Sequence, residues 1–165
     1  MKIEDNFLDQ NIFDKLQAFI MGDELSWYYN SYIVDEGEKD FQFTHVYYRY
    51  NSPQSNHYPN LLPIIDKLDF YSLAIIKSNL LTRTSNIAKH TFHVDINEID
   101  PEKQKHWTTS IFYVNTNNGY TEFEDGTKVE SVANRMVIFS ANLKHRGTSC
   151  TDENTRVVIN FNYFK

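Results

Sequence analysis

The amino-acid sequence predicts a mainly β protein with two helices near its N-terminus, and two observations support this fold class. Aromatic residues make up 15% of the 165 residues, with 12 Phe and 11 Tyr, and aromatic side chains are enriched in strands. Helical periodicity is confined to two stretches before residue 70, whereas short apolar or alternating segments recur from residue 27 onwards. A chain of this length can bury a sizeable core without disulfides.

The first helix is predicted to begin after Asp9, a favourable N-cap, and to run to about Met21. Its apolar residues fall at positions i, i+1, i+4, i+7 and i+8, which places them on one face: Ile12, Phe13, Leu16, Phe19 and Ile20. Gly22 then provides a stop signal. We therefore expect a helix that packs one side against a sheet.

A second, shorter helix is predicted from about Asn60 to Leu68. Its apolar positions form another stripe: Leu61, Leu62, Ile64, Ile65 and Leu68. Pro63 falls within this segment, and proline is tolerated only in the first turn of a helix.

The remaining periodic segments are predicted strands. They are Trp27–Val34, Phe41–Tyr50, Ser72–Leu81, Thr91–Asp95, Trp107–Val114, Thr121–Glu124, Lys128–Val132, Met136–Ser140 and Arg156–Phe164. Asn118-Gly119 and Asp125-Gly126 are turn dipeptides, the second joining two short strands as a hairpin. Two leading helices followed by so many strands indicate a double-stranded β-helix, a jelly-roll or cupin-like barrel with the helices packed on one sheet. Without repeats or linkers, residues 1–165 are expected to form one domain, in which 1–70 support a barrel formed by 71–165.

Composition narrows the class of protein. The formal net charge of −6 disfavours a protein whose main task is binding nucleic-acid phosphates. The single cysteine excludes an internal disulfide, and neither a signal-peptide core nor a membrane-length apolar stretch is present. We expect a cytoplasmic protein. The abundance of Asn, Ile, Lys, Phe and Tyr is typical of AT-rich genomes and indicates a bacterium, or a host cytoplasm if a phage encodes it.

His93-Val94-Asp95 is the first part of a candidate metal site. Chance alone gives about 0.4 His-x-Asp matches in this composition, so the motif by itself is weak. In a strand, His93 and Asp95 would point to the same face, and His145 supplies a third ligand downstream. Two imidazoles and one carboxylate suit Fe(II) and leave three coordination positions open.

Arg156 opens the apolar C-terminal strand and is the candidate partner of a bound carboxylate. An arginine that enters a barrel needs an anion, because burying it unpaired is costly. Its planar guanidinium matches a carboxylate through two parallel hydrogen bonds. Tyr113 shares a predicted strand face with Thr109 and Ile111 and is the candidate second donor. The alternatives are an arginine that points to solvent and a tyrosine that only packs in the core.

Several segments together carry a resemblance to a known family: residues 109–115 (TSIFYVN), 119–123 (GYTEF), 136–139 (MVIF), His145 and Thr155-Arg156. Over about residues 72–164 the chain resembles the prolyl 4-hydroxylase superfamily of Fe(II)/2-oxoglutarate oxygenases, and is most similar to the compact hypoxia-factor-type and bacterial prolyl hydroxylases. The resemblance implies that His93, Asp95 and His145 bind a catalytic iron.

The resemblance also implies the cosubstrates and the reaction. Arg156 and Tyr113 would hold the C5 carboxylate of 2-oxoglutarate, O2 would be the second cosubstrate, and ascorbate the reductant. The product would be a hydroxylated C–H bond, in a peptidyl proline or another protein side chain, with release of succinate and CO2.

The sequence departs from that family at two positions. A tyrosine that often contacts the cosubstrate region is replaced by Leu81, so Asn79, two residues earlier on the same face, becomes the candidate for that contact. A tryptophan six residues after the arginine is replaced by Asn162, which becomes the candidate substrate-binding residue and leaves proline as the substrate open. The spare histidines His90 and His106 are expected in exposed loops.

Four other functions stay open. A hydroxylase of a free amino acid or small metabolite would use the same site. A nucleic-acid demethylase would carry a second arginine where Asn162 stands. A non-catalytic cupin-like binding protein would show a Gly-rich motif with three histidines and a glutamate, which is missing. A zinc hydrolase could use the three ligands but would not need Arg156.

Overall fold

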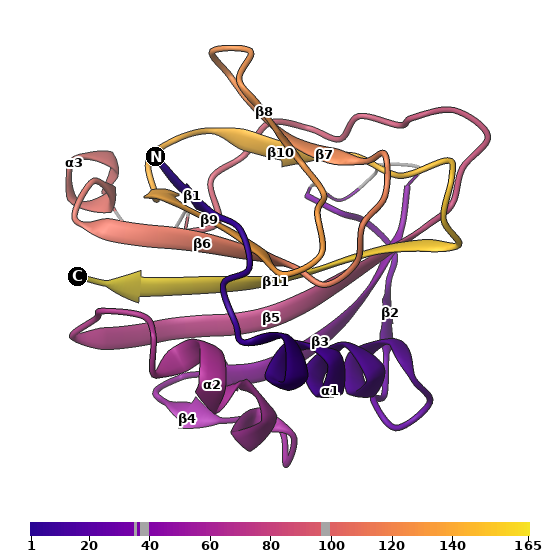
Figure 1. Ribbon diagram of the computed structural model, residues 1–165. Helices are drawn as coiled ribbons and strands as arrows, with labels where there is room; N and C mark the ends of the chain where they lie inside the picture. The colour runs from indigo at the N-terminus through magenta and orange to yellow at the C-terminus, as the bar shows by residue number, and fades with distance from the viewer. Residues whose placement is uncertain (35, 37–39, 97–99) are drawn as a thin grey trace.

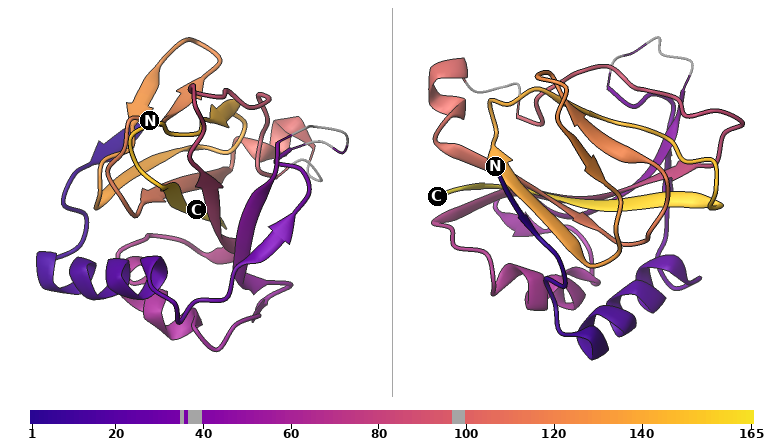
Figure 2. Two further views of the ribbon diagram at one scale, coloured as in Figure 1. Left: turned by 90° about the vertical axis from the view of Figure 1, so that its right-hand side faces the viewer. Right: turned by 45° about the horizontal axis from the view of Figure 1, so that its top comes forward.

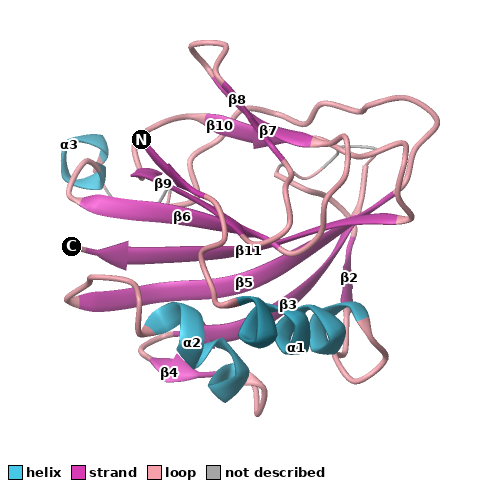
Figure 3. Cartoon of the chain, viewed as in Figure 1, coloured by secondary structure: helices cyan, strands magenta, loops and turns pink. Residues whose placement is uncertain are grey.

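The computed structural model describes residues 1–34, 36, 40–96 and 100–165. Most strands in this part of the chain form a large sheet and a smaller one (Figure 1 and Figure 3). The larger sheet contains β1 (Lys2–Glu4), β2 (Tyr28–Asn30), β3 (Gln42–Arg49), β4 (Ser52–Pro53), β5 (Ser72–Thr82), β6 (Trp107–Tyr113), β9 (Arg135–Ser140) and β11 (Thr155–Phe164). The smaller one contains β7 (Tyr120–Phe123), β8 (Lys128–Glu130) and β10 (His145–Gly147).

The larger sheet is built around its C-terminal strand. Its order is β1-β9-β6-β11-β5-β3-β2, with β4 paired to β3. β11 is antiparallel to β5 over its whole length and to β6 from Val158 to Phe164. The smaller sheet has the order β10-β7-β8. Two facing antiparallel sheets of this kind make the double-stranded β-helix that the sequence predicts.

Helices cover the outer face of the larger sheet. α1 (Gln10–Met21), the 3₁₀ turn η1 (Tyr58–Leu61) and α2 (Leu62–Ile65) lie on one side of it (Figure 2). Phe13, Leu16 and Ile20 of α1 join one apolar cluster with Phe112 of β6 and Ile159 of β11. The N-terminal strand β1 then pairs with β9 at the edge of the sheet. The helices therefore close the core on the side away from the smaller sheet.

The helix predictions agree with the structure in position. α1 begins directly after Asp9 and ends before Gly22, where an added Cβ would lie 2.7 Å from the carbonyl oxygen of Ala18. Asp9 accepts the first helical bonds through its backbone carbonyl rather than capping through its side chain. The second helix is shorter than predicted, because residues 58–61 are a 3₁₀ turn and α2 ends at Ile65.

Most strand predictions agree within a residue or two, but two are wrong. Trp27–Val34 contains only the short β2, and Thr91–Asp95 is not a strand, because only His93 within it finds a paired residue. β1, β4 and the four-residue helix α3 (Pro101–Gln104) were not predicted. The Asp125-Gly126 turn does join β7 and β8 as a hairpin, and Gly126 has a φ of 86° there.

The inner face of the larger sheet looks toward the smaller sheet across a second, smaller apolar cluster. Ile111, Tyr113 and Val158 of the larger sheet pack there with Phe123 and Val129 of the smaller one. Phe112 and Val114 belong to the outer core, so the two faces of β6 divide as its alternation predicts. Over the described residues, no helix has the length and apolar character needed to cross a membrane.

Candidate active site

Two histidines that are far apart in the sequence meet in one backbone pair. The amide of His93 donates to the carbonyl of His145 at 2.9 Å, and the amide of His145 donates to the carbonyl of His93 at 3.0 Å. Such a reciprocal pair places both side chains on the same face of the bridge, and the two imidazole centroids are 4.9 Å apart. This isolated β-bridge, rather than the predicted strand, therefore positions His93 beside His145.

The two imidazoles are oriented as metal ligands. Nδ1 of His93 lies 3.1 Å from the carbonyl oxygen of Thr91, and Nδ1 of His145 lies 3.2 Å from that of Leu143. A carbonyl only accepts, so each Nδ1 carries the hydrogen and each Nε2 keeps its lone pair. Both Nε2 atoms face Oδ1 of Asp95, at 3.5 Å and 3.7 Å.

Asp95 completes a three-ligand cluster whose ligand atoms all lie within 4.8 Å of one another. Its Oδ2 accepts from Nδ2 of Asn160 at 3.2 Å and from Nδ2 of Asn162 at 3.4 Å. These bonds leave Oδ1 directed at the histidines. Distances of 3.5–3.7 Å are long for hydrogen bonds. The three ligand atoms therefore surround a common position instead of hydrogen-bonding to each other.

Electrostatics keep Asp95 and His145 in the forms that bind a cation, whereas, against the lowering effect of burial, Asp95 raises the pKa of His93. Burial alone would raise the pKa of the Asp95 carboxyl, but the close approach of His93 and His145 and the charge of Lys77 hold it well below its usual range. Burial lowers the pKa of His145, against the attraction of Asp95. A carboxylate and a neutral imidazole are the forms that coordinate metals. This donor set, two imidazole nitrogens and one carboxylate oxygen, fits Fe(II).

Arg156 lines the cavity that the three metal ligands also line, and it is only 3% exposed. Its Nε donates to Oγ of Ser131 at 2.9 Å, and its Nη2 to Oγ1 of Thr121 at 3.2 Å. Burial lowers its pKa, yet arginine stays protonated in proteins. No acidic side chain in the described part of the chain forms an ion pair with it. The site therefore contains a buried positive charge that no anion of the described chain neutralises.

Gly119 makes room for this arginine, whereas a side chain at Gly147 would only reach ordinary contact with it. A Cβ at Gly119 would lie 2.7 Å from Cδ of Arg156 and equally close to the carbonyl oxygen of Ser149. A Cβ at Gly147 would lie 3.4 Å from Nη1 of Arg156. A side chain at Gly119 would therefore displace the guanidinium, which explains why glycine follows Asn118 in what the sequence shows only as a turn.

Tyr113 is fully buried beside Arg156, whose guanidinium carbon lies 5.7 Å from the centre of its ring. The tyrosine hydroxyl donates to Oγ1 of Thr121 at 2.8 Å. Thr121 thus receives hydrogen bonds from both residues that were predicted to hold a carboxylate. Tyr113 stands behind Thr121 and does not line the cavity directly.

The cavity has a volume of about 80 Å³ and joins the metal ligands to Arg156. This exceeds the roughly 10–15 Å³ that one water molecule requires. Lys77 and Asn79 line it from β5, opposite Asn160 and Val158 of β11. Oδ1 of Asn79 and Oδ1 of Asn160 are buried without a hydrogen-bond partner, and unsatisfied buried acceptors mark a place where a ligand could donate.

The structure separates the remaining candidate residues. Asn79 lines the cavity, and its contact with the cosubstrate stays a prediction. Asn162 does not line it: it is 2% exposed, accepts from Oγ1 of Thr109 at 2.8 Å and donates to Asp95. The expectation that His90 lies in an exposed loop is wrong, because it is 7% exposed and lines the cavity, while His106 is exposed.

Four residues that sequence reasoning missed belong to the site: Lys77, Thr121, Ser131 and Asn160. Strand alternation carried a signal for two of them, because Asn160 shares a face with Arg156 on β11 and Lys77 shares one with Asn79 on β5. Thr121 and Ser131 are ordinary hydroxyl residues with no local signal. Their role exists only because the barrel places them against Arg156.

Comparison with known proteins supports the fold. No protein-family model matches the sequence, and no curated protein is similar to it at a significant level. Solved structures are similar in fold. They include a viral collagen prolyl hydroxylase from Paramecium Bursaria Chlorella virus-1 in a 2-oxoglutarate complex, with a TM-score of 0.63 and 14% identity over 99% of this chain and 95% of that chain.

A second similar structure is a prolyl hydroxylase from Trichoplax adhaerens in complex with a fragment of the hypoxia inducible factor oxygen degradation domain. Its TM-score is 0.67 at 13% identity, over 99% of this chain and 82% of that one. A third is HygX from Streptomyces hygroscopicus with nickel, 2-oxoglutarate and hygromycin B bound, with a TM-score of 0.60 and 11% identity over 98% and 81%. The chain shares the double-stranded β-helix of these structures, as its sequence resemblance predicted.

Proposed function

We propose that this protein is an Fe(II)- and 2-oxoglutarate-dependent dioxygenase that hydroxylates a C–H bond of a peptidyl proline or another protein side chain. The observation that carries the proposal is the combination of two features in one cavity. Three convergent metal ligands lie at one end of it, and a buried arginine without an acidic partner in the described chain lies at the other. A metal hydrolase would need only the first feature.

His93, Asp95 and His145 would hold the iron. Asn160 and Asn162 fix the Asp95 carboxylate from behind, and Thr91 and Leu143 fix the two imidazoles through their carbonyls. When bound, Fe(II) with 2-oxoglutarate and O2 supplies the chemistry that converts C–H to C–OH and releases succinate and CO2. The protein contributes position and charge.

Arg156 would bind the C5 carboxylate of 2-oxoglutarate. On β11 it stands four residues from Asn160, the residue that holds Asp95. This spacing along a strand is roughly 13 Å. The cosubstrate has a carboxylate at each end, so one end can reach the metal ligands while the other pairs with the guanidinium. Ser131 and Thr121 accept hydrogen bonds from that guanidinium, and the Tyr113 hydroxyl donates to Thr121 behind it.

The likeness to solved structures adds support for this reaction class. The structures with the same fold include prolyl hydroxylases, one with a peptide fragment bound, and one protein that binds nickel and 2-oxoglutarate. The acidic net charge disfavours nucleic acid as the partner. Iron, 2-oxoglutarate and O2 are therefore the proposed cofactor and cosubstrates, with ascorbate as a reductant.

The test measures metal binding and cosubstrate consumption separately. The purified protein should bind one Fe(II) per chain and, with 2-oxoglutarate, O2 and ascorbate, should form succinate. Proline-containing peptides should then give products heavier by one oxygen. Succinate formation that persists in an Asp95→Ala variant would contradict the proposal, and the exposed Asp23→Ala variant is the matched control.

A further inference from the structure

Lys77 is a cation in the candidate active site that the proposed reaction does not use. It lines the cavity from the inner face of β5 and lies opposite Asn160, the residue that holds Asp95. It is partly buried and makes no hydrogen bond or ion pair with the described residues. Its electrostatic neighbours are Asp95 and a second cation, Arg49.

Asp95 also borders a second hollow. An open groove of about 390 Å³ runs from the β3–β4 turn, across the start of β5, to Asp95 and Trp107. Arg49 lines this groove. The β3–β5 ladder ends at the Tyr48/Ile76 pair, so β3 does not pair with the start of β5 and the groove opens beside it. A molecule that entered by this groove would meet Arg49 first and Lys77 next to the metal ligands.

The described residues that line the cavity and the groove carry a net positive charge. They include three cations, Lys77, Arg49 and Arg156, and one carboxylate, Asp95, which gives 3 − 1 = +2. Fe(II) adds two positive charges and 2-oxoglutarate adds two negative ones, so the balance stays at +2. The whole chain carries −6, so this local excess is opposite in sign to the rest of the protein. A half-buried cation without a partner is costly.

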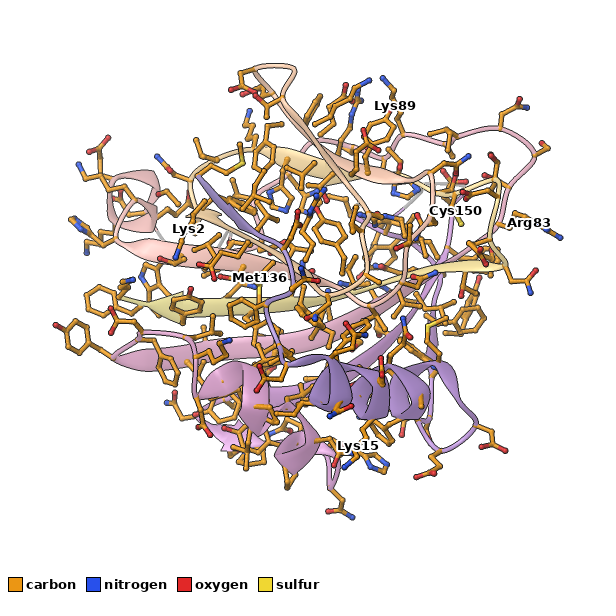
Figure 4. All side chains as sticks on the ribbon, viewed as in Figure 1. Lys2, Lys15, Arg83, Lys89, Met136 and Cys150 are labelled. Atoms are coloured by element: carbon orange, nitrogen blue, oxygen red, sulfur yellow. The ribbon has the colours of Figure 1, made fainter. Side chains whose placement is uncertain are left out.

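Other basic side chains nearby are not unpaired cations beside the metal ligands. Lys89 pairs with Glu122 at 3.4 Å, and Arg83 points away from the molecule (Figure 4). Arg156 is four residue pairs away from Lys77 along the β11–β5 ladder, at the end where the C5 carboxylate is expected. Lys77 therefore lies beside the candidate metal ligands, where it can bind an anion other than the C5 carboxylate.

We propose that the molecule oxidised by this protein carries a carboxylate close to the oxidised carbon, and that Lys77 binds this carboxylate after Arg49 has attracted it. This inference rests on the proposed function and adds the substrate class. The carboxylate could belong to an acidic residue of a peptide or to a free amino acid. Both present the same group to Lys77, and separate arms of the test distinguish them.

The experiment measures binding in the absence of turnover. The protein is loaded with Zn(II) and 2-oxoglutarate, and calorimetry compares matched acids and amides. The peptide arm uses acetyl-Glu-Pro-Glu-amide against acetyl-Gln-Pro-Gln-amide. The free arm uses L-proline against L-prolinamide and L-glutamate against its diamide. We expect the acid to bind roughly ten- to a hundredfold more tightly than its amide in at least one arm, the usual value of a charged hydrogen bond.

Variants assign the preference to Lys77. Lys77→Met should remove the difference between acid and amide, Lys77→Arg should retain it, and Lys128→Met on the exposed hairpin should not change it. Thermal unfolding of each variant checks that it is folded. The inference is overturned if no acid binds more tightly than its amide, if the preference survives in Lys77→Met, or if Lys77→Met weakens 2-oxoglutarate itself tenfold. Failure of the wild-type protein to bind zinc or 2-oxoglutarate would instead overturn the proposed function, and this inference with it.

Discussion

The two faces of β11 are made from alternate residues of one strand but have opposite properties. The outer face carries Val157, Ile159, Phe161 and Tyr163, all 2% exposed or less and packed into the core beneath the helices. The inner face carries the apolar Val158 and three polar residues, the buried Arg156 and Asn162 and the partly buried Asn160, which point toward the metal ligands and the cavity. Apolar burial stabilises the fold, whereas buried polar groups need partners. The outer face should therefore determine stability, and the inner face binding.

Removing a metal ligand should have the largest effect of any inner-face change. Asp95→Ala leaves two histidines, and it also leaves the amides of Asn160 and Asn162 without their acceptor. We expect metal binding and succinate formation to fall below detection, measured by metal analysis and a coupled turnover assay, while the protein stays folded. Retained iron at one equivalent per chain would show that the carboxylate is not a ligand.

Removing a large outer-face side chain should affect stability and leave the site unchanged. Phe161 is fully buried in the core, and Phe→Ala at such sites costs about 3–5 kcal/mol of unfolding free energy. Urea denaturation of Phe161→Ala should show that loss, and the folded protein should bind metal with unchanged affinity. A loss below about 1 kcal/mol would mean that the outer face does not determine stability as the comparison requires.

Arg156→Ala tests the proposed carboxylate-binding residue on the inner face of β11. The proposed contact with 2-oxoglutarate is charge-assisted and buried, so its loss should weaken cosubstrate binding by roughly 2–4 kcal/mol. Metal binding should persist, because Arg156 makes no hydrogen bond or ion pair with His93, Asp95 or His145. Calorimetry with the zinc-loaded protein measures both. Equal 2-oxoglutarate affinity in the variant and the wild type would place the carboxylate elsewhere.

Tyr113→Phe should have the smallest effect. The tyrosine hydroxyl donates to Thr121, which is also an acceptor for Arg156. The change therefore removes a hydrogen bond that positions Thr121 beside the arginine. We expect about 1 kcal/mol weaker 2-oxoglutarate binding and almost no loss of stability, since the ring remains in place. An effect as large as that of Arg156→Ala would indicate that the hydroxyl itself contacts the cosubstrate.

The sequence determined the parts of this protein that depend on local patterns. The 3.6-residue period located α1, and the Asp-Gly turn located the β7–β8 hairpin. Alternation put Tyr113 and Phe112 on opposite faces of β6. The His-x-Asp motif with a downstream histidine also selected the three residues that meet as the metal cluster. These features were readable because periodicity, turn chemistry and metal-ligand type are properties of neighbouring residues.

Tertiary structure alone decided which distant residues complete the site. β1 exists because β9 lies beside it, and His93 is paired because His145 arrives opposite it. Asn162, which the sequence named as a substrate contact, bonds to Asp95 instead of lining the cavity, and Lys77 lines the cavity next to Asp95. The physical reason is that hydrogen-bond partners and burial are set by contacts between strands far apart in the sequence, which no local period encodes.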